Sequence, residues 1–392
     1  MDYPERFSAL PEYAFPRLRT LIDHLQPGGP ALSMTIGEPR HAAPAWISDV
    51  LAQNVAGFGV YPPSDGEPAL LSSISGWIAR RYGVDVGPER ISVLNGSREG
   101  LFNTLISQCP ERKNGQVPVV LIPNPFYQVY AVAALSISAE PVYVNATAET
   151  GFLPDYESLP PELLDRVAVA YLCSPANPQG AVATVEYLSR LLDLAERHDF
   201  TIFCDECYSE IWRDAPPPGL LAVAAARGAD PDRVVVFNSL SKRSNVPGMR
   251  SGFVAAGPNA IRPLRQLRAY TSAPIPLPLQ RVSARLWDDE THVVANRALY
   301  HEKFRIADQV LAGIPGASVP EGGFFLWLPV EDGEQAALRL WQETGVRVLP
   351  GAYLSRDTTE GNPGKGYIRV ALVAPAEETG RGLELIRDCI YR

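Results

Sequence analysis

Short apolar runs separated by polar turns recur through the middle of the chain, and they predict strands. The clearest runs occupy residues 117–124, 167–175, 200–206, 233–239 and 252–257. These runs are almost continuously apolar and do not alternate with polar residues. That pattern is typical of strands buried on both faces of a covered parallel sheet.

The segment between the second and third of these runs has the period of an amphipathic helix. Four apolar residues fall on one face of it: Leu188, Leu191, Leu192 and Ala195. Thr184 precedes them and predicts the N-cap of the helix. Strand, helix and strand in this order indicate an α/β domain with right-handed crossovers.

The two ends of the chain have a different pattern. Residues 15–26 predict a short helix that the sequence Pro-Gly-Gly-Pro then stops. After residue 288 helices dominate, with strands predicted at 323–330, 346–351 and 366–372. A chain of 392 residues exceeds what one core usually serves. We therefore expect a large domain at 46–287, a small α+β domain at 288–392, and a segment at 1–45 packed on the small domain.

The composition is that of an ordinary soluble globular protein, with 46% hydrophobic residues and a net charge of −9. The negative charge argues against nucleic acid or an anionic membrane as a partner. No apolar run is long enough to span a bilayer, and the start lacks the apolar segment of a secretory signal. Five cysteines, an odd number, indicate reduced thiols, so we expect a cytoplasmic location.

Cys204 and Cys207 form a C-x-x-C pair, but no further ligands stand at the spacing that a zinc site needs. We interpret both as small buried residues at a strand end and expect no bound metal. The sequence leaves open whether either thiol adjusts the neighbouring Asp205.

Polar residues follow the predicted strands, at the edge where an open parallel sheet binds its ligands. Gly96 and Ser97 precede a helical segment whose free N–H groups suit a phosphate. The other residues near this edge are Tyr127, Asn177, Asp205, Tyr208, Ser239, Lys242 and Arg250. Taken singly, each has a structural explanation, such as a capping serine or a turn asparagine. Lysine occurs at only four positions, however, so Lys242 is not generic surface charge.

Together these residues meet the needs of pyridoxal 5′-phosphate. Its aldehyde reacts with a lysine amine, for which Lys242 is available, and its ring nitrogen needs a carboxylate such as Asp205. Its phenolic oxygen needs donors, which Asn177 and Tyr208 supply. Its phosphate suits a helix N-terminus with a serine and an arginine, and its ring suits an aromatic face. We therefore predict pyridoxal 5′-phosphate as the cofactor.

The ordered motifs along the chain resemble those of class I aminotransferases of the aspartate aminotransferase fold. They read IGEP, YPPSDGEPAL, GSREGL, NPFYQVY, SPANPQG, CDECYSE, SLSKRSNVPGMRSG, PGAYL and GYIRVAL. The resemblance implies fold type I of the pyridoxal-phosphate-dependent transferases. In that α/β fold a large domain has a mostly parallel seven-stranded sheet between helices, beside a smaller α+β domain. Within the class, the motifs are most similar to those of N-succinyldiaminopimelate aminotransferases.

The resemblance also implies a role for each matching residue. Lys242 would form the Schiff base and then carry a proton between the substrate Cα and the cofactor. Asp205 would pair with the ring nitrogen, and Tyr127 would stack on the ring. Asn177 and Tyr208 would hold the phenolate oxygen. The phosphate would be bound by Gly96, Ser97, Arg98, Ser239 and Arg250.

Substrate and subunit contacts follow from the same resemblance. Arg369 would clamp the substrate α-carboxylate, helped by Gly37 and Asn177. Because Arg369 alternates with apolar neighbours on a predicted strand, an outward-facing arginine is the structural alternative. Tyr61 would reach the phosphate of a neighbouring subunit, which implies a homodimer; simple interface packing is its alternative.

The implied reaction is a two-stage amino transfer from glutamate to N-succinyl-2-amino-6-oxopimelate, in diaminopimelate and lysine biosynthesis. A second carboxylate in the acceptor calls for a second cation, with four candidates: Arg17, Arg19, Arg243 and Arg268. The alternatives are an aminotransferase for aspartate, aromatic or other amino acids, and a cysteine-conjugate β-lyase. A ligand-sensing regulator would need an N-terminal DNA-binding module, and the enzyme-like motifs already begin by residue 36.

Overall fold

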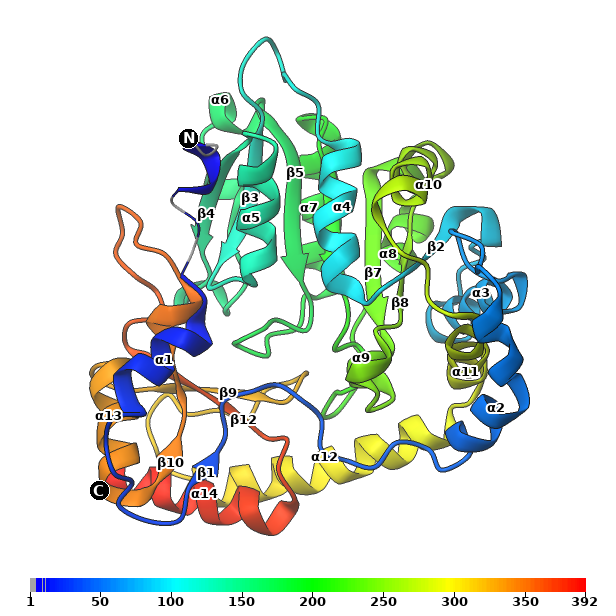
Figure 1. The fold of residues 1–392 in the computed structure, drawn as a ribbon. Coiled ribbons are helices and arrows are strands. Elements are labelled where there is room, and N and C mark those ends of the chain that lie inside the picture. The colour runs from blue at the N-terminus through cyan, green and yellow to red at the C-terminus, as the bar shows by residue number, and fades with distance from the viewer. Residues whose placement is uncertain (1–4, 9, 11) are drawn as a thin grey trace.

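The computed structural model describes residues 5–8, 10 and 12–392. Its centre is a seven-stranded sheet with the order β2, β8, β7, β6, β5, β3, β4 (Figure 1). In that order the strands are Ile91–Leu94, Gly252–Ala255, Val234–Ser239, Thr201–Asp205, Val167–Cys173, Val119–Asn124 and Glu140–Asn145. All neighbours pair in parallel except β8, which is antiparallel to β2 and to β7.

Successive residues of each strand point to opposite faces of the sheet, so both faces carry apolar side chains. Helices cover both faces. On β7, Val234 and Val236 pack into one apolar core, while Val235 and Phe237 pack into the other. The first core is covered by α3 (Pro68–Tyr82), α7 (Val185–Arg197), α8 (Leu220–Arg227) and α11 (Leu277–Asp288). The second is covered by α4 (Ser97–Gln108), α5 (Gln128–Ser136) and α10 (Pro258–Thr271), and α4 and α5 lie in front of the sheet in Figure 1.

The helix predicted between the apolar runs 167–175 and 200–206 is α7, and Thr184 is its N-cap, as predicted. The Thr184 side chain accepts a hydrogen bond from the backbone N–H of Tyr187 at 3.2 Å. Leu188, Leu191 and Leu192 are buried against the sheet. The five predicted strands correspond to β3, β5, β6, β7 and β8, so this part of the prediction is confirmed.

The C-terminal third forms a third apolar core, around the antiparallel sheet β11–β12–β9. These strands are Leu349–Pro350, Tyr367–Ala371 and Phe325–Pro329. Three helices surround them: α12 (Thr291–Val310), α13 (Gly333–Thr344) and α14 (Ala376–Ile390). In Figure 1 the long α12 runs beneath the large sheet toward these elements.

The N-terminal segment packs against the C-terminal part of the chain. Helix α1 (Ala14–Ile22) packs with α13, and β1 (Leu32–Ser33) pairs in parallel with β10 (Val346–Arg347). Residues 1–4, 9 and 11 of the segment lie outside the described residues. On these contacts we propose the division into residues 1–45, 46–287 and 288–392.

Three helices remain. α2 (Ile47–Asn54) lies at the right of Figure 1, the short α6 (Pro161–Leu164) precedes β5, and the four-residue α9 (Leu240–Arg243) directly follows β7. Along the described part of the chain, no helix is both long enough and apolar enough to cross a bilayer.

Candidate active site

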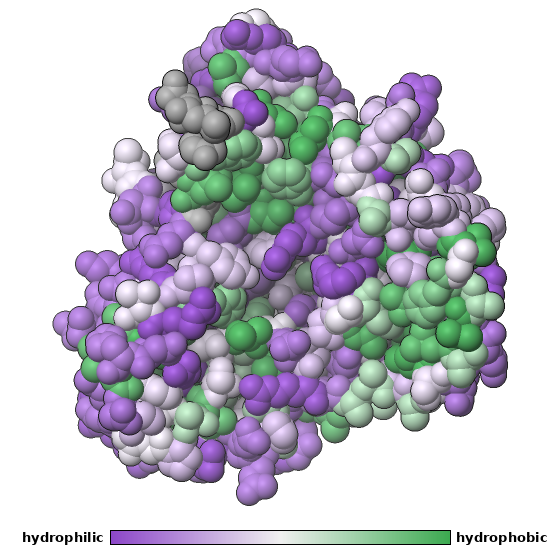
Figure 2. All heavy atoms as spheres, in the orientation of Figure 1, coloured by the Kyte–Doolittle hydropathy of each residue, from purple (hydrophilic) through white to green (hydrophobic). Residues whose placement is uncertain are grey.

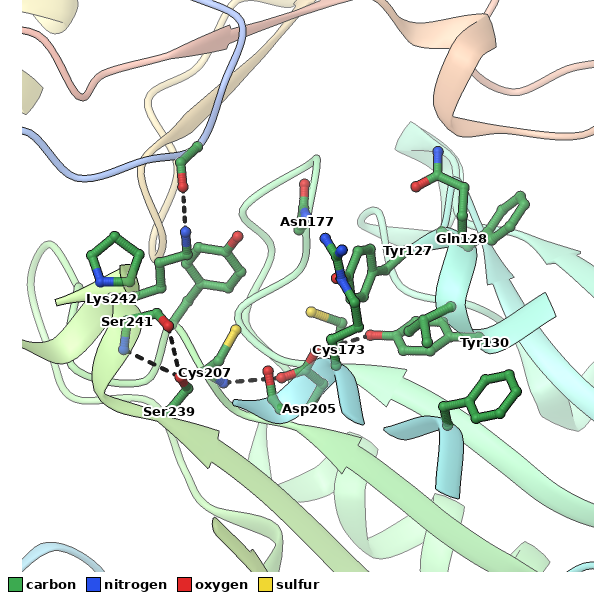
Figure 3. Close-up of a pocket in the computed structure, with 18 of the residues that line it drawn as sticks. Tyr127, Gln128, Tyr130, Cys173, Asn177, Asp205, Cys207, Ser239, Ser241 and Lys242 are labelled. Carbon is green, nitrogen blue, oxygen red and sulfur yellow. Dashed lines mark hydrogen bonds between the residues drawn. The ribbon is translucent and has the colours of Figure 1, made fainter. Parts of the chain in front are cut away.

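A cavity of about 770 Å³ opens where the large sheet faces the C-terminal core, and Figure 2 shows the hollow near the centre of the molecule. It lies at the C-terminal ends of β5, β6 and β7, the edge that the sequence predicts. Most of the predicted site residues line it: Gly37, Ser97, Arg98, Tyr127, Asn177, Asp205, Tyr208, Ser239, Lys242, Arg250 and Arg369. Figure 3 shows Lys242, Ser239 and Ser241 on one side, with Asp205 between them and Tyr127.

Lys242 lies in α9, the single helical turn that follows β7. Its Nζ donates a hydrogen bond to the backbone carbonyl of Gly37, so the N-terminal segment reaches the reactive amine. Burial lowers the pKa of Lys242 to about 8, although Cys207 nearby acts in the opposite direction. An amine with this pKa is unprotonated in a substantial fraction near neutral pH, as a nucleophile or proton acceptor requires.

Asp205 is the last residue of β6 and is only 4% exposed. One carboxylate oxygen, Oδ1, accepts a hydrogen bond from the backbone N–H of Cys207 at 3.2 Å. The other, Oδ2, accepts one from the hydroxyl of Tyr130, also at 3.2 Å (Figure 3). Burial raises the pKa of Asp205, and the bonds from Cys207 and Tyr130 oppose this change. A buried carboxylate of this kind calls for a cation in the cavity that it lines.

The predicted phosphate cluster is assembled around the N-terminus of α4. Gly96 is the N-cap at φ +79°, and a Cβ there would lie 2.2 Å from Nη2 of Arg250. Arg250 donates to the carbonyls of Pro247 at 3.0 Å and Asn95 at 3.2 Å. Among the described residues no carboxylate pairs with Arg250, so its charge is free for an anion.

Two hydroxyls complete this cluster. Ser239 is the N-cap of α9, and its Oγ bonds the Oγ of Ser241 at 3.0 Å. Ser241 was not among the residues predicted from the sequence, although its position two residues after Ser239 was a visible signal. A helix N-terminus, two hydroxyls and an unpaired guanidinium form a donor set that suits a phosphate.

The side chain of Arg98 extends to Tyr127. Its Nε donates to the hydroxyl of Tyr127, and its guanidinium lies 5.5 Å from the centre of that ring. Arg98 makes no hydrogen bond to Ser97, Ser239 or Arg250 in the described part of the chain. Its guanidinium therefore lies beside the aromatic side chain that the sequence predicts to stack on the cofactor.

Arg369 points into the cavity, so the outward-facing alternative is wrong. It is 4% exposed, and Nη1 and Nη2 donate to Asn177 Oδ1 at 3.0 Å and to the Thr35 carbonyl at 2.8 Å. Its Nε has no hydrogen-bond partner among the described residues, and no carboxylate pairs with it there. Burial lowers the pKa of Arg369 to about 10. A buried guanidinium with free donors indicates a site for a carboxylate ligand.

Tyr208 and Gly37 lie close to this guanidinium. Tyr208 is buried, and burial raises the pKa of its hydroxyl well above the usual value, so it remains a donor. A Cβ on Gly37 would lie 2.4 Å from the ring of Phe325, over which Arg369 also stacks at 4.1 Å. The close approach of Gly37 therefore depends on its lack of a side chain.

Three of the four candidates for a second cation are held in ion pairs. Arg17, Arg243 and Arg268 form ion pairs of 2.8–3.0 Å with Glu334, Glu290 and Glu99 respectively. Arg19 is exposed. None of the four lines the cavity. Arg98, which does line it, is the cation that sequence reasoning assigned to a different group.

Tyr61 does not line the cavity of its own chain and is 98% exposed. Apolar residues exposed beside it are Val55, Phe58 and Val60. Figure 2 shows a green area at the right, over the end of the molecule that holds α2, α3 and α11. Exposed apolar patches of this kind are typical of interaction surfaces.

In the described part of the chain the cysteines form no disulfide and belong to no cluster of potential metal ligands. All five are unpaired thiols, and no group of three His, Cys, Asp or Glu there could hold a metal ion. Cys204 is buried in β6, as expected for a small strand residue. Cys207 is buried too, but it also lines the cavity next to Asp205.

The donor set therefore fits pyridoxal 5′-phosphate at each of its polar groups. The fit rests on a buried carboxylate, an amine with a lowered pKa, a cluster of anion-binding donors at a helix N-terminus and an aromatic side chain in the cavity wall.

Comparisons with known proteins agree with this arrangement. Residues 30–386 match the family described as Aminotransferase class I and II. The chain is 32% identical over 398 residues to an LL-diaminopimelate aminotransferase of Desulforudis audaxviator, covering 99% of this chain and 98% of the relative. It is 37% identical to an aminotransferase of Neisseria meningitidis in its crystal structure, with a TM-score of 0.93 and coverage of 98% and 99%.

A second solved structure, the aminotransferase AspB of Helicobacter pylori, is 33% identical with a TM-score of 0.91, covering 98% of this chain and all of that one. The predicted fold class, with a mostly parallel seven-stranded sheet and a smaller α+β part, is confirmed. The chain belongs to the class I and II aminotransferases, which use pyridoxal 5′-phosphate as their cofactor.

Proposed function

We propose that this aminotransferase moves an amino group between glutamate and a substrate of the diaminopimelate type, in the biosynthesis of diaminopimelate and lysine. The acceptor that the sequence motifs favour is N-succinyl-2-amino-6-oxopimelate. LL-diaminopimelate, as the amino donor to 2-oxoglutarate, is the second candidate substrate, because relatives at 32% and 28% identity carry the name LL-diaminopimelate aminotransferase. We also propose a cytoplasmic location, which the five unpaired thiols support.

The bound cofactor supplies an electron-withdrawing ring that makes the substrate Cα–H acidic. In this proposal Asp205 holds the ring nitrogen, and Tyr127 covers one face of the ring. Asn177 and Tyr208 donate hydrogen bonds to the phenolic oxygen. The phosphate is bound by the cluster of Gly96, Ser97, Ser239, Ser241 and Arg250, in which the backbone of Arg98 also takes part.

Lys242 would hold the cofactor covalently and, once released, would move a proton at its Nζ. Its pKa of about 8 supports this second role, because the neutral amine is accessible at working pH. The Gly37 carbonyl accepts from Nζ, so the amine has a resting partner in the N-terminal segment. This contact orients the amine toward the cavity.

The observation that carries the substrate proposal is the presence of two cations beyond those that the cofactor needs. Arg369 is buried with free donors, which suits the α-carboxylate that every amino acid brings. Arg98 lines the same cavity with its guanidinium on Tyr127. We assign Arg98 to the distal carboxylate of a dicarboxylic substrate, such as glutamate or the acceptor.

We further propose a homodimer in which Tyr61 reaches the phosphate of the neighbouring subunit. The support is its nearly complete exposure beside Val55, Phe58 and Val60, and its distance in the fold from the cavity of its own chain. An exposed tyrosine on an apolar surface is well suited to bridging between subunits.

A panel of acceptors tests the substrate assignment. With glutamate as donor, we expect the highest kcat/KM for N-succinyl-2-amino-6-oxopimelate. Turnover of LL-diaminopimelate with 2-oxoglutarate instead would favour the second candidate. Preference for oxaloacetate or an aromatic oxo acid, or release of pyruvate from a cysteine conjugate, would contradict both. Parallel double-reciprocal lines for the two substrates would support the two-stage transfer.

A further inference from the structure

The Asp205 carboxylate is held from two sides by donors of the chain itself. Oδ1 accepts from the backbone N–H of Cys207 and Oδ2 accepts from the hydroxyl of Tyr130, both at 3.2 Å. A carboxylate can accept about four hydrogen bonds, so each oxygen keeps a lone pair for the cavity that Asp205 lines. The two donors thus fix the orientation of the carboxylate while leaving it able to bind a ligand.

The charge state of Asp205 depends on these donors, because burial favours its neutral form. The titratable groups that face it come from four elements: Tyr127 and Tyr130 at the start of α5, Cys173 of β5, Cys207 and Tyr208 after β6, and Lys242 of α9. Lys242 is the one cation in this set, and it serves the cofactor. The thiol of Cys207 and the hydroxyl of Tyr130 are the side-chain donors that stabilise the ionised carboxylate.

The surroundings of Tyr130 hold its hydroxyl in place as a hydrogen-bond donor. Its side chain is fully buried, and burial raises the pKa of its hydroxyl well above the usual value, so the proton stays on the oxygen. Its ring stacks on Tyr171 with centroids 4.4 Å apart and planes 16° from parallel. It meets the ring of Tyr127 edge-on at 5.8 Å. With both neighbours in place, the hydroxyl has little freedom to leave Asp205.

The same helical turn carries the aromatic wall of the cavity. Tyr127 is the N-cap of α5, and Tyr130 lies in the first turn, with its N–H donating to the Tyr127 carbonyl at 3.0 Å. One turn of backbone therefore places both the ring that faces the cofactor and the hydroxyl that holds its carboxylate partner (Figure 3).

We infer that Tyr130 is a positioning residue, whose hydroxyl keeps Asp205 ionised and oriented for the ring nitrogen of the cofactor and thereby sets the affinity for the cofactor at low pH. The inference rests on the proposed role of Asp205. It does not depend on which acceptor the enzyme uses.

Tyr171 provides a matched control for the test. It is also fully buried, it forms the other half of the same stack, and its hydroxyl donates to the Leu101 carbonyl at 2.7 Å. The variants Tyr130→Phe and Tyr171→Phe each remove one buried hydroxyl hydrogen bond. Only Tyr130→Phe removes a donor to Asp205.

The readout is the dissociation constant of pyridoxal 5′-phosphate, measured by titrating the cofactor-free protein from pH 6 to 9. We expect similar losses in melting temperature for both variants, but weaker cofactor binding for Tyr130→Phe alone, by about tenfold at pH 7. The defect should grow toward pH 6. Without the donor the pKa of Asp205 rises further, so the ionised form is lost at a higher pH.

Asp205→Asn separates the two ways in which the inference can fail. We expect Asp205→Asn to weaken cofactor binding and to abolish any further effect of Tyr130→Phe. If Asp205→Asn binds the cofactor as tightly as the wild type, the proposed role of Asp205 and this inference both fail. If Asp205→Asn weakens binding while Tyr130→Phe matches Tyr171→Phe at every pH, only the inference about Tyr130 is overturned.

A second substitution covers the case in which Tyr130→Phe does not fold. Replacing Tyr130 with 3-fluorotyrosine keeps the hydroxyl and nearly the same shape, and makes the phenol more acidic and a stronger donor. We expect tighter cofactor binding at pH 6, in the opposite direction to the phenylalanine variant, and no change from 3-fluorotyrosine at position 171. Equal affinities for the two fluorinated proteins and the wild type would overturn the inference.

Discussion

Arg369 and Asn177 lie 192 positions apart in the sequence, and Nη1 of the arginine donates to Oδ1 of the asparagine at 3.0 Å. Arg369 comes from β12 in the C-terminal core, and Asn177 comes from the loop after β5 of the large sheet. The proposed carboxylate site therefore spans two parts of the fold. It is complete only when both parts hold their relative positions.

This relationship predicts the effect of Arg369→Lys. The lysine keeps a charge but loses the planar fork that can bind Asn177 and a carboxylate together. We expect the KM for glutamate to rise about a hundredfold, while the binding of the cofactor changes little. Steady-state kinetics with glutamate and a cofactor titration measure the two effects.

Arg347→Lys is the matched control, because Arg347 lies in β10, which pairs with β1, and forms an ion pair with Asp23 at 3.0 Å, outside the cavity. Its KM should stay within about twofold of the wild type, as for an exposed ion pair. A KM for Arg369→Lys that equals that of the control would remove Arg369 from the carboxylate site.

The lowered pKa of Lys242 predicts a pH dependence of the chemical step. Burial brings this pKa to about 8, and only the neutral amine can accept a proton at Nζ. The neutral fraction rises with pH, so kcat should increase through about pH 8 and fall roughly tenfold per unit well below it. Saturating substrates and a pH series from 6 to 9.5 would show this. A kcat that stays constant down to pH 6 would contradict the role of Lys242 as base.

The assignment of Arg98 predicts a loss that depends on the substrate. Arg98→Gln should lower kcat/KM by about tenfold, or ~1.4 kcal/mol, for acceptors with a distal carboxylate. It should leave pyruvate, which has none, almost unchanged. Arg17→Gln is the control variant for Arg98→Gln, because Arg17 forms an ion pair with Glu334 at 2.8 Å outside the cavity. Equal losses for dicarboxylic acceptors and pyruvate would mean that Arg98 serves the cofactor or the fold.

The proposed dimer depends on the exposed apolar surface around Tyr61. Phe58 is 57% exposed there, and Phe58→Asp would place a charge in an interface that excludes water. We expect the variant to sediment as a monomer and to bind the cofactor more weakly than the wild type. Val294→Asp changes an exposed apolar residue of α12 outside the patch, and it should remain a dimer. A wild type that sediments as a monomer would contradict the proposal.

Much of the large sheet could be predicted from the sequence because its strands are buried on both faces. Continuous apolar runs such as 234–239 have no other simple interpretation at this length. The edge strand β4 was missed, since Glu140 and Pro141 interrupt its pattern and most of its residues are only partly buried. β1 and β10 were also missed as a pair, because two-residue strands have no period to detect.

The site was predictable where chemistry follows directly after a strand, as with Asp205 and Lys242. The site was not predictable where the direction of a long side chain decides which group it contacts. Arg98 follows Ser97 in the sequence, yet its guanidinium lies on Tyr127. Tyr130 reaches Asp205 from another element, so no local pattern marks it. Its position three residues after Tyr127, on the same turn of a helix, was the only available signal.

The most direct test of the account is to find which lysine holds the cofactor. The chain has four lysines, at 113, 242, 303 and 365. Lys303 is a strict internal control, because it is buried and its pKa is also lowered to about 8 by burial. Reduction of the yellow protein with borohydride, followed by digestion and mass spectrometry, should place the phosphopyridoxyl group on Lys242 alone. A label on Lys303, or on no lysine, would contradict the account.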